Sequence, residues 1–427
     1  MSEPFPLLNT SADALHSFEE VSNTTATDAS TNNVEKRRPR KSSALGTMDI
    51  RAGDTGAALA TSKTALDAAD QNSVSGGSPS PGLKKRSVRR RRGFFGRARH
   101  IMIKHTFVLP ALIALAMLAA YAVRPNESNL MHRFIFLSYK EPSMLDANGS
   151  VQYGKGPWDI AFVAFYTVVL SFTREFVMQE MIKPLARRAG LRSKGKLARF
   201  MEQGYTAFYF FFLGPLGMYV MSRTPVWYFN TRGMYEGFPH RHHDAFTKFY
   251  YLFQAAYWAQ QAIVLVLGME KPRKDFKELI AHHIVSLALI GLSYRFHFTY
   301  IGIAVYTTHD ISDFFLATSK TLNYLNHPIT DKFYAFFICV WIYMRHYINL
   351  KIIWSLFTEF RTVGPFELNW ETEQYKCLLS QVITTSLLTS LQALNLFWLY
   401  YILRIAYRAV FKNELKDDRS DDEEEEP

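Results

Sequence analysis

Residues 282–324 read HHIVSLALIGLSYRFHFTYIGIAVYTTHDISDFFLATSKTLNY, and this stretch decides the fold. It contains most of two apolar runs joined by a short hairpin, each close to the roughly 20 residues that a helix needs to cross a membrane. Ionisable side chains interrupt both runs: His282 and His283 near the start of the first, and His309-Asp310-Ile311-Ser312-Asp313 inside the second. A charged side chain at mid-bilayer costs about 2.5–3.5 kcal/mol, so we expect these residues to face a polar cavity and to have a function.

Six further apolar runs accompany this pair. Together the eight runs are 105–123, 158–178, 203–222, 247–268, 279–297, 300–319, 333–357 and 378–404. The sequence therefore predicts an all-α polytopic membrane protein with about eight transmembrane helices. The mean hydropathy of −0.08 conceals this, because polar segments at the two ends dilute the apolar core.

The composition divides the chain into four parts. Residues 1–104 are polar and cannot bury enough surface to offset their ordering entropy, so we expect a disordered cytosolic tail. Residues 105–199 are expected to hold two N-terminal transmembrane helices with a lumenal and a cytosolic loop. Residues 200–405 should form the six-helix core, and 406–427 an acidic cytosolic tail.

The distribution of charge predicts the orientation in the membrane. The net charge of +11 reflects a cluster of ten Lys and Arg in 84–104 and further basic loops that all fall on one side of the predicted spans. By the positive-inside rule that side is cytosolic, and so are both termini. The sequons at Asn126 and Asn148 then fall in a lumenal loop, where glycosylation is expected. Since the basic cluster directly precedes a span and contains Phe94 and Phe95, anionic membrane lipid is a simpler partner for it than nucleic acid, which we do not expect to bind.

Helix geometry brings the ionisable residues together. His309 and Asp313 are separated by four positions, and Asp310 and Asp313 by three, so each pair shares a helix face. The hairpin places the two helices side by side. The paired residues His282 and His283 can therefore meet the two carboxylates in the half of the bilayer nearer the cytosol.

Such a group favours proton transfer or acyl transfer. A carboxylate bonded to an imidazole fixes its tautomer and stabilises the imidazolium, which makes a general base or a nucleophile. A metal site is not expected, because neighbouring residues on a helix point about 100° apart and the spacing is not that of helical metal ligands. A hydrogen-bond network that only holds the hairpin together is the structural alternative.

These residues resemble the Lag motif of ceramide synthases. The matching positions are His282, His283, Ser293, Tyr294, Gly302, His309, Asp310, Ser312, Asp313, Lys320 and Tyr324. The resemblance covers roughly 155–412, includes Arg345 and His346, and is strongest to the fungal branch. Some relatives have a basic residue at the position of Tyr300 and an acid at that of Ala317. Neither position is assigned to the chemistry.

The resemblance implies an enzyme of the endoplasmic-reticulum membrane. It would transfer a fatty acyl group, very long in fungal relatives, from acyl-CoA to the amine of a sphingoid base, with no cofactor. It also implies a TLC-type bundle, formed by the last six helices around a central chamber. A small single-span accessory subunit is the implied partner, and homo- or hetero-dimers are compatible with it.

The chemistry can be assigned to particular residues in two ways. In the first, His282 accepts the acyl group with the help of Asp313, and His283 and Asp310 orient it or take the proton of the amine. In the second, the amine attacks directly and a histidine is the general base. His309 and Ser312 are supporting residues in both.

Further residues are candidates for substrate binding. Lys274 and Lys277 precede the paired histidines and could bind CoA phosphates, although topology alone also explains a basic loop. Arg345 and His346 could contact a sphingoid head group or bond to neighbouring helices. Trp258 could line the chamber.

Two other function classes remain open. A non-enzymatic TLC-type lipid sensor or chaperone would not need the paired histidines and the His-Asp-x-Ser-Asp segment. A proton-coupled transporter would also use intramembrane acids and histidines, but it should show an internal helix repeat, which the sequence does not display.

Overall fold

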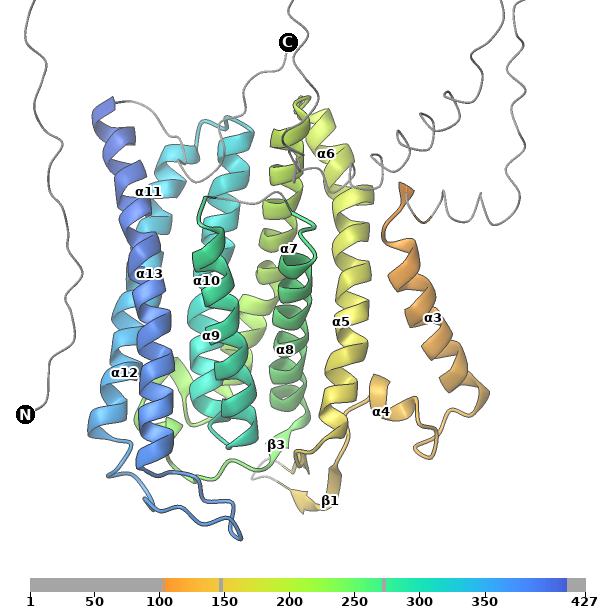
Figure 1. The fold of residues 1–427 in the computed structure, drawn as a ribbon, viewed down its shortest axis with the longest axis vertical. Helices are drawn as coiled ribbons and strands as arrows, with labels where there is room; N and C mark the ends of the chain where they lie inside the picture. The colour runs from red at the N-terminus through yellow and green to blue at the C-terminus, as the bar shows by residue number, and fades with distance from the viewer. Residues whose placement is uncertain (1–101, 103, 146–148, 271–273, 413–427) are drawn as a thin grey trace, which may run out of the picture. The chain divides into compact units, whose positions relative to one another are not determined.

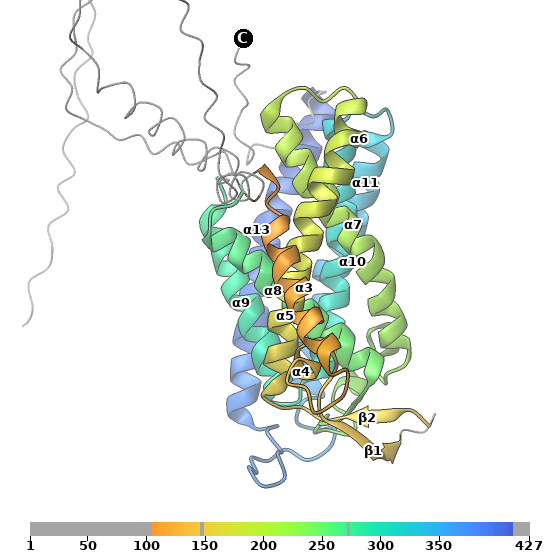
Figure 2. The same ribbon diagram turned by 90° about the vertical axis from the view of Figure 1, so that its right-hand side faces the viewer.

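The computed structural model describes residues 102, 104–145, 149–270 and 274–412. The long helices of this part run side by side, and α3 lies at one edge (Figures 1 and 2). Most of the predicted N-terminal tail, the residues of the acidic tail beyond 412 and the sequon residue Asn148 lie outside the described residues.

Helices lie at all eight ranges that the sequence predicts. They are α3 (Val108–Val123); α5 (Trp158–Phe176), continued by η1 (Val177–Ile182) and α6 (Lys183–Arg188); α7 (Lys194–Ser222); α8 (Ala245–Val266); α9 (Phe276–Arg295); α10 (Thr299–Tyr324); α11 (Thr330–Trp341), continued by η4 (Ile342–Ile348) and α12 (Asn349–Thr358); and α13 (Leu378–Lys412). Judged by length and composition alone, four helices among the described residues can cross a membrane: Trp158–Arg188, Phe276–Arg295, Thr330–Thr358 and Leu378–Phe411. The predicted all-α polytopic membrane protein is thus confirmed, while the count of eight spans stays a prediction.

The helix α10 is not among these four, because it carries too many polar residues. Its place inside the bundle explains how it can carry them. It packs against α7, α8, α9, α11 and η4, so its polar side chains face other helices. Thr307, Thr308, His309, Asp310 and Ser312 are all buried there. Polar residues inside a membrane bundle form bonds between helices, and this helix accordingly carries the ionisable residues of the predicted site.

A small cap of short helical turns and short strands lies at one end of the bundle (Figure 2). The all-α prediction did not include its strands. The cap contains α4 (His132–Ile135), the 3-10 turns η2 (Trp227–Phe229) and η3 (Arg232–Met234), and an antiparallel sheet of β1 (Lys140–Leu145), β2 (Val151–Tyr153) and β3 (His243–Asp244). Lys140 pairs with Tyr153, and Gln152 with Asp244. Such short strands have no apolar alternation long enough to be recognised in a sequence.

A buried lysine attaches this cap to the helices. Lys248 of α8 forms an ion pair with Asp159 of α5 at 2.8 Å and donates hydrogen bonds to the carbonyl oxygens of Ser138 and Gly154. The other carboxylate oxygen of Asp159 accepts a hydrogen bond of 2.8 Å from the hydroxyl of Tyr294 at the end of α9. The α9–α10 hairpin, and with it the predicted site, is therefore fixed to α5 and α8.

Candidate active site

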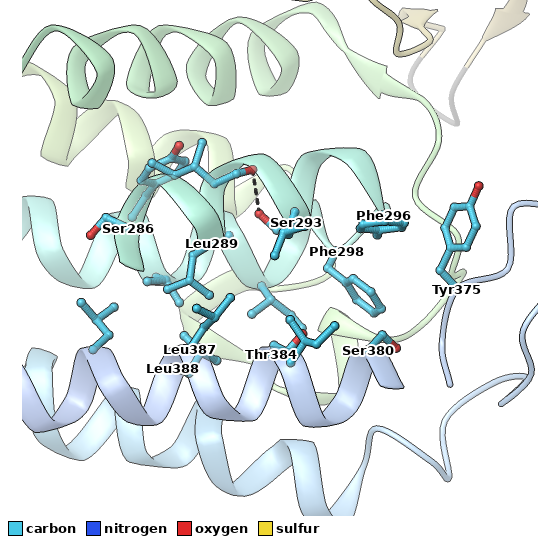
Figure 3. Close-up of a pocket in the computed structure, with 18 of the residues that line it drawn as sticks. Ser286, Leu289, Ser293, Phe296, Phe298, Tyr375, Ser380, Thr384, Leu387 and Leu388 are labelled. Atoms are coloured by element: carbon cyan, nitrogen blue, oxygen red, sulfur yellow. Dashed lines mark hydrogen bonds between the residues drawn. The ribbon is translucent and has the colours of Figure 1, made fainter. Parts of the chain in front are cut away.

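An apolar cavity lies between α8, α9, α10 and α13, and its empty volume is about 1160 Å³ when the open space at its mouth is included. Figure 3 shows Ser286, Leu289 and Ser293 of α9 across from Thr384 and Leu388 of α13. Residues of the loop before α13 close one end. Apolar walls with a few polar groups are typical of a site for a lipid-like ligand. We call this space the apolar cavity.

His282 lies in the wall of this cavity, together with Trp258 and His309. Its ring is 5% exposed and packs edge-on against Trp258 and Trp398, with ring centroids 5.5 Å and 5.2 Å away. Its Nδ1 atom is buried without a hydrogen-bond partner among the described residues. Buried polar atoms are rarely left unpaired in proteins, so an imidazole nitrogen without a described partner in the lining of this cavity is a candidate for contact with a ligand.

His283 has a different environment. Its Nδ1 atom bonds to the carbonyl oxygen of Leu279, one turn earlier in the same helix, at 2.9 Å. It is not among the residues that line the apolar cavity. The angle between successive side chains on a helix thus separates the two histidines, as the sequence predicted.

Asp310 is fully buried behind the cavity wall. One carboxylate oxygen, Oδ2, accepts hydrogen bonds from the hydroxyl of Tyr250, at 3.0 Å, and from the side-chain amide of Gln254. Gln254 in turn accepts a hydrogen bond from Tyr209 at 3.1 Å. Asp310 therefore joins α10 to α8 and α7. The sequence analysis missed these partners, although the spacing of Tyr250 and Gln254 by four residues was a signal that both lie on one face of α8.

Asp313 has a cation as its described partner. Its Oδ1 atom lies 2.5 Å from Nη2 of Arg345, whose Nε donates to the hydroxyl of Ser312 at 2.6 Å. The guanidinium also lies 4.3 Å from the ring centre of Trp341. The sequence expected an imidazole beside Asp313; within the described part of the chain, its hydrogen bond goes to Arg345 instead.

The hydrogen bonds around His309 define its tautomer. Arg345 can only donate, so the oxygen of the Asn395 side chain accepts from it, at 3.0 Å. The nitrogen of the same amide then faces Nε2 of His309 at 3.4 Å, while Nδ1 of His309 donates to the carbonyl oxygen of Val305 at 2.8 Å. Both ring nitrogens of His309 are occupied. Among His282, His283, His309 and His346, only His282 has no described hydrogen bond on its ring.

Comparison with known proteins agrees with this site. Residues 199–404 match the family model TRAM_LAG1_CLN8, described as the TLC domain. The sphingosine N-acyltransferase-like protein FUM17 of Gibberella moniliformis is 53% identical over 80% of this chain and 89% of its own. Sphingosine N-acyltransferase lac1 of Schizosaccharomyces pombe is 48% identical over 83% of this chain and 92% of its own, and ceramide synthase LAG1 of Saccharomyces cerevisiae 44% over 77% and 79%.

The chain belongs to the sphingosine N-acyltransferase family. The matched TLC domain contains α8, α9, α10 and most of α13, so it includes the walls of the apolar cavity as well as His282, His309, Asp310, Asp313 and Arg345. The resemblance that the Lag motif indicated is therefore confirmed.

In this sphingosine N-acyltransferase family member, His346 lies between helices and outside the cavity wall. Its Nδ1 atom faces the side-chain amide of Gln392 at 2.8 Å, and Gln392 accepts a hydrogen bond from Asn349 at 2.7 Å. Of the two roles considered for Arg345 and His346, the described contacts support bonding to neighbouring helices.

The predicted CoA-binding lysines lie at the end of the bundle where α9 begins and α13 ends (Figure 1). Lys274 lines a second pocket there, whereas Lys277 is exposed and does not line it. The other lining residues of this second pocket are Asp275, Glu278, Phe397, Tyr401, Arg404 and Arg408. We call this space the basic pocket, because it contains three cations and two acids.

At the other end of the bundle, Asn126 follows α3 in an exposed loop, and its side-chain oxygen accepts a hydrogen bond of 2.6 Å from Ser128 of the same sequon. Its exposure is compatible with a glycosylation site. Glycosylation itself stays a prediction.

Proposed function

We propose that this protein is a ceramide synthase that transfers a fatty acyl group from acyl-CoA to the amine of a sphingoid base. The observation that carries the proposal is His282, an imidazole without a hydrogen-bond partner in the wall of a large apolar cavity. The names of the relatives support the acyl transfer and its amine acceptor. A thioester is already activated for acyl transfer, so the reaction needs no further cofactor.

We propose that His282 is the residue that reacts. In one route its ring nitrogen attacks the thioester carbonyl, the C–S bond breaks, and CoA leaves as a thiolate that takes up a proton. The amine then attacks the acyl-imidazole, the amide bond forms, and the imidazole is released. In the other route the amine attacks the thioester directly and His282 removes its proton. Both routes use a neutral imidazole with a free nitrogen.

The other predicted residues take positioning roles in this proposal. Asp310, with Tyr250 and Gln254, holds α10 against α8 behind the reacting group. Asp313 neutralises Arg345, and Asn395 orients His309. Trp258 supports the ring of His282 and forms part of the chamber wall for an acyl or sphingoid chain.

The decisive experiment uses purified protein, a sphingoid base and acyl-CoA, with the lipid products identified by mass spectrometry. His282→Asn should lose at least a hundredfold in rate with its thermal unfolding unchanged. His283→Asn is the matched variant and should keep more activity, because its ring lies outside the cavity wall. A fully active His282→Asn would refute the site. A wild-type protein that binds lipid but makes no ceramide would favour the sensor alternative.

The two routes differ in one observable. Protein loaded with acyl-CoA in the absence of base should carry an acyl group on His282 if the first route operates. Wild-type protein that forms ceramide without any such adduct under rapid quenching would favour direct attack by the amine.

We also propose the cellular setting that the family resemblance implies. The protein would lie in the endoplasmic-reticulum membrane with both termini in the cytosol, use very-long-chain acyl groups, and pair with a small single-span subunit. The start of α3 and the end of α13 lie at the same end of the bundle, which supports termini on one side (Figure 1). Competition between acyl-CoAs of different length in the same assay tests the chain preference, and co-purification from membranes tests the subunit and any dimer.

A further inference from the structure

One side chain contacts a lining residue of the apolar cavity and a lining residue of the basic pocket. Trp398 of α13 packs against His282, which lines the apolar cavity, with ring centroids 5.2 Å apart. Its indole nitrogen Nε1 donates a hydrogen bond of 3.2 Å to Oδ2 of Asp275, which lines the basic pocket. Trp398 thus links one residue of each space.

The position of the Trp398 ring is fixed from two sides. Asp275 directly precedes α9 and is 4% exposed, so its carboxylate is held at the start of that helix. The tryptophan ring belongs to a small apolar cluster with Phe337, Trp341 and Ile402. A hydrogen bond to the start of α9 and packing on α13 therefore hold the indole against His282.

The chemistry of acyl-CoA requires both spaces. Its head group is a polyanion that suits a pocket containing Lys274, Arg404 and Arg408, and its acyl chain suits apolar walls. The thioester lies between head group and chain and must reach His282, against which Trp398 packs. With the hydrogen bond intact, the indole stays beside His282 and takes up space that the thioester needs.

We propose that Trp398 and Asp275 form a gate that acyl-CoA opens on binding, and that the closed gate keeps water from the acyl group. This inference rests on the proposed function, since it takes acyl-CoA as the donor. The closed state competes with donor binding, so weakening the hydrogen bond should tighten apparent binding of the donor. It should also let water reach the thioester or the acyl-imidazole, which then hydrolyses to free fatty acid.

The test compares variants that remove the hydrogen bond with variants that do not. Trp398→Phe keeps an aromatic ring and loses the donor, while Asp275→Ala loses the acceptor. Trp354→Phe makes the same exchange at a tryptophan of α12 that is 67% exposed. Each variant is assayed for the KM of acyl-CoA, the KM of the base, and release of CoA without base.

We expect Trp398→Phe and Asp275→Ala to lower the KM of acyl-CoA at least threefold and to raise CoA release without base about tenfold. The KM of the base should stay within twofold. In the double variant, Asp275→Ala should lower the KM less than it does in the wild-type background, because Trp398→Phe has already removed their shared hydrogen bond. Asp275→Asn, which keeps a carbonyl oxygen for the indole, should lie closer to wild type than Asp275→Ala, and Trp354→Phe should not differ from wild type.

Several results would overturn the gate. They are an unchanged KM and unchanged CoA release in Trp398→Phe, a raised KM for both substrates, or Asp275→Asn behaving as Asp275→Ala. If Asp275→Ala fails to fold, the comparison of Trp398→Phe with Trp354→Phe tests the gate without it. A wild-type protein that makes no ceramide from acyl-CoA refutes the proposed function, whereas an active wild type with the results above refutes only the gate.

Discussion

At the scale of single residues, hydrogen bonds rather than positions in the sequence distinguish the ionisable groups. His282 and His309 both line the cavity, but Asn395 and a backbone carbonyl occupy the ring of His309. Asp310 is fully buried and Asp313 half-buried in α10, and one accepts from neutral groups whereas the other accepts from a guanidinium. Each pair looks alike in the sequence, and only the partners on other helices separate its members.

The ion pair between Arg345 and Asp313 gives a prediction about stability. Asp313→Leu alone leaves the buried Arg345 without its partner and should cost about 3–5 kcal/mol, while Arg345→Met alone leaves the half-buried Asp313 unpaired and should cost less. The combined variant removes both charges and should recover much of the melting temperature, measured in detergent. If each single variant melts like wild type, the pair has no structural role.

The same variants separate structure from chemistry at Asp313. A combined variant that regains its melting temperature but makes no ceramide would show that Asp313, Arg345 or both also act in the reaction. A combined variant that regains both its melting temperature and ceramide synthesis would show that the ion pair only positions the helices.

At the scale of elements, a glycine allows two helices to pack closely where it faces a tyrosine of the neighbouring helix. A Cβ atom on Gly302 of α10 would lie 2.6 Å from the hydroxyl oxygen of Tyr251 on α8. That hydroxyl is itself hydrogen-bonded to Ser293 of α9, so Tyr251 cannot move away without breaking a contact. The glycine of the Lag-like motif is thus explained by the packing of three helices.

Exchange of this glycine has a matched control. Gly302→Ala should destabilise the protein by about 1–3 kcal/mol through overpacking. Gly291→Ala, at a site in α9 where the added methyl group would meet nothing within 4 Å, should be neutral or stabilise by up to about 1 kcal/mol. Thermal unfolding of the two variants checks this, and equal melting temperatures would contradict the close approach.

The cap adds a dependence on pH. Burial lowers the pKa of His240, in the loop before β3, to about 4. The unfolded chain binds a proton near the ordinary pKa of about 6.5, while the folded protein stays neutral at this site until about pH 4. The contribution of His240 to stability is therefore complete above pH 6.5 and is lost as the pH falls. His240→Gln should flatten the decline of the melting temperature between pH 6.5 and 4; an unchanged slope would exclude this residue as its cause.

At the scale of the whole molecule, the length of the apolar runs predicted the helices, and the asymmetry of charge predicted their orientation in the membrane. Helices lie at all eight predicted ranges because such runs need only local information. The ion pair of Arg345 with Asp313 and the bonds of Asp310 to α8 could not be predicted, since they depend on how helices far apart in the sequence rotate about their axes. The sequence did not predict the sheet of the cap, because its strands are short and pair only over a few residues.

The predicted orientation is tested at this scale. The protein expressed in a eukaryotic cell should carry a glycan at Asn126, and Asn126→Gln should remove it and increase the mobility of the band after electrophoresis. The variant Asn148→Gln tests the second sequon separately. Resistance of the wild-type band to glycosidase, together with protease access to 124–157 from the cytosolic side of sealed vesicles, would reverse the topology.

The π-helical segment η4 has a consequence for how this chain can evolve. It lies in the middle of a continuous helix, and because a π-turn holds about one residue more than an α-turn, it takes up one residue while α11 and α12 keep their faces toward the bundle. Removing one residue there, with return to an ordinary α-turn, would leave α12 close to its present orientation, and buried Ile352 would stay in the core. Removing one residue from the regular part of α11 would instead rotate all that follows by roughly 100°. A change in the length of this helix is therefore easier to accommodate within η4 than elsewhere along it.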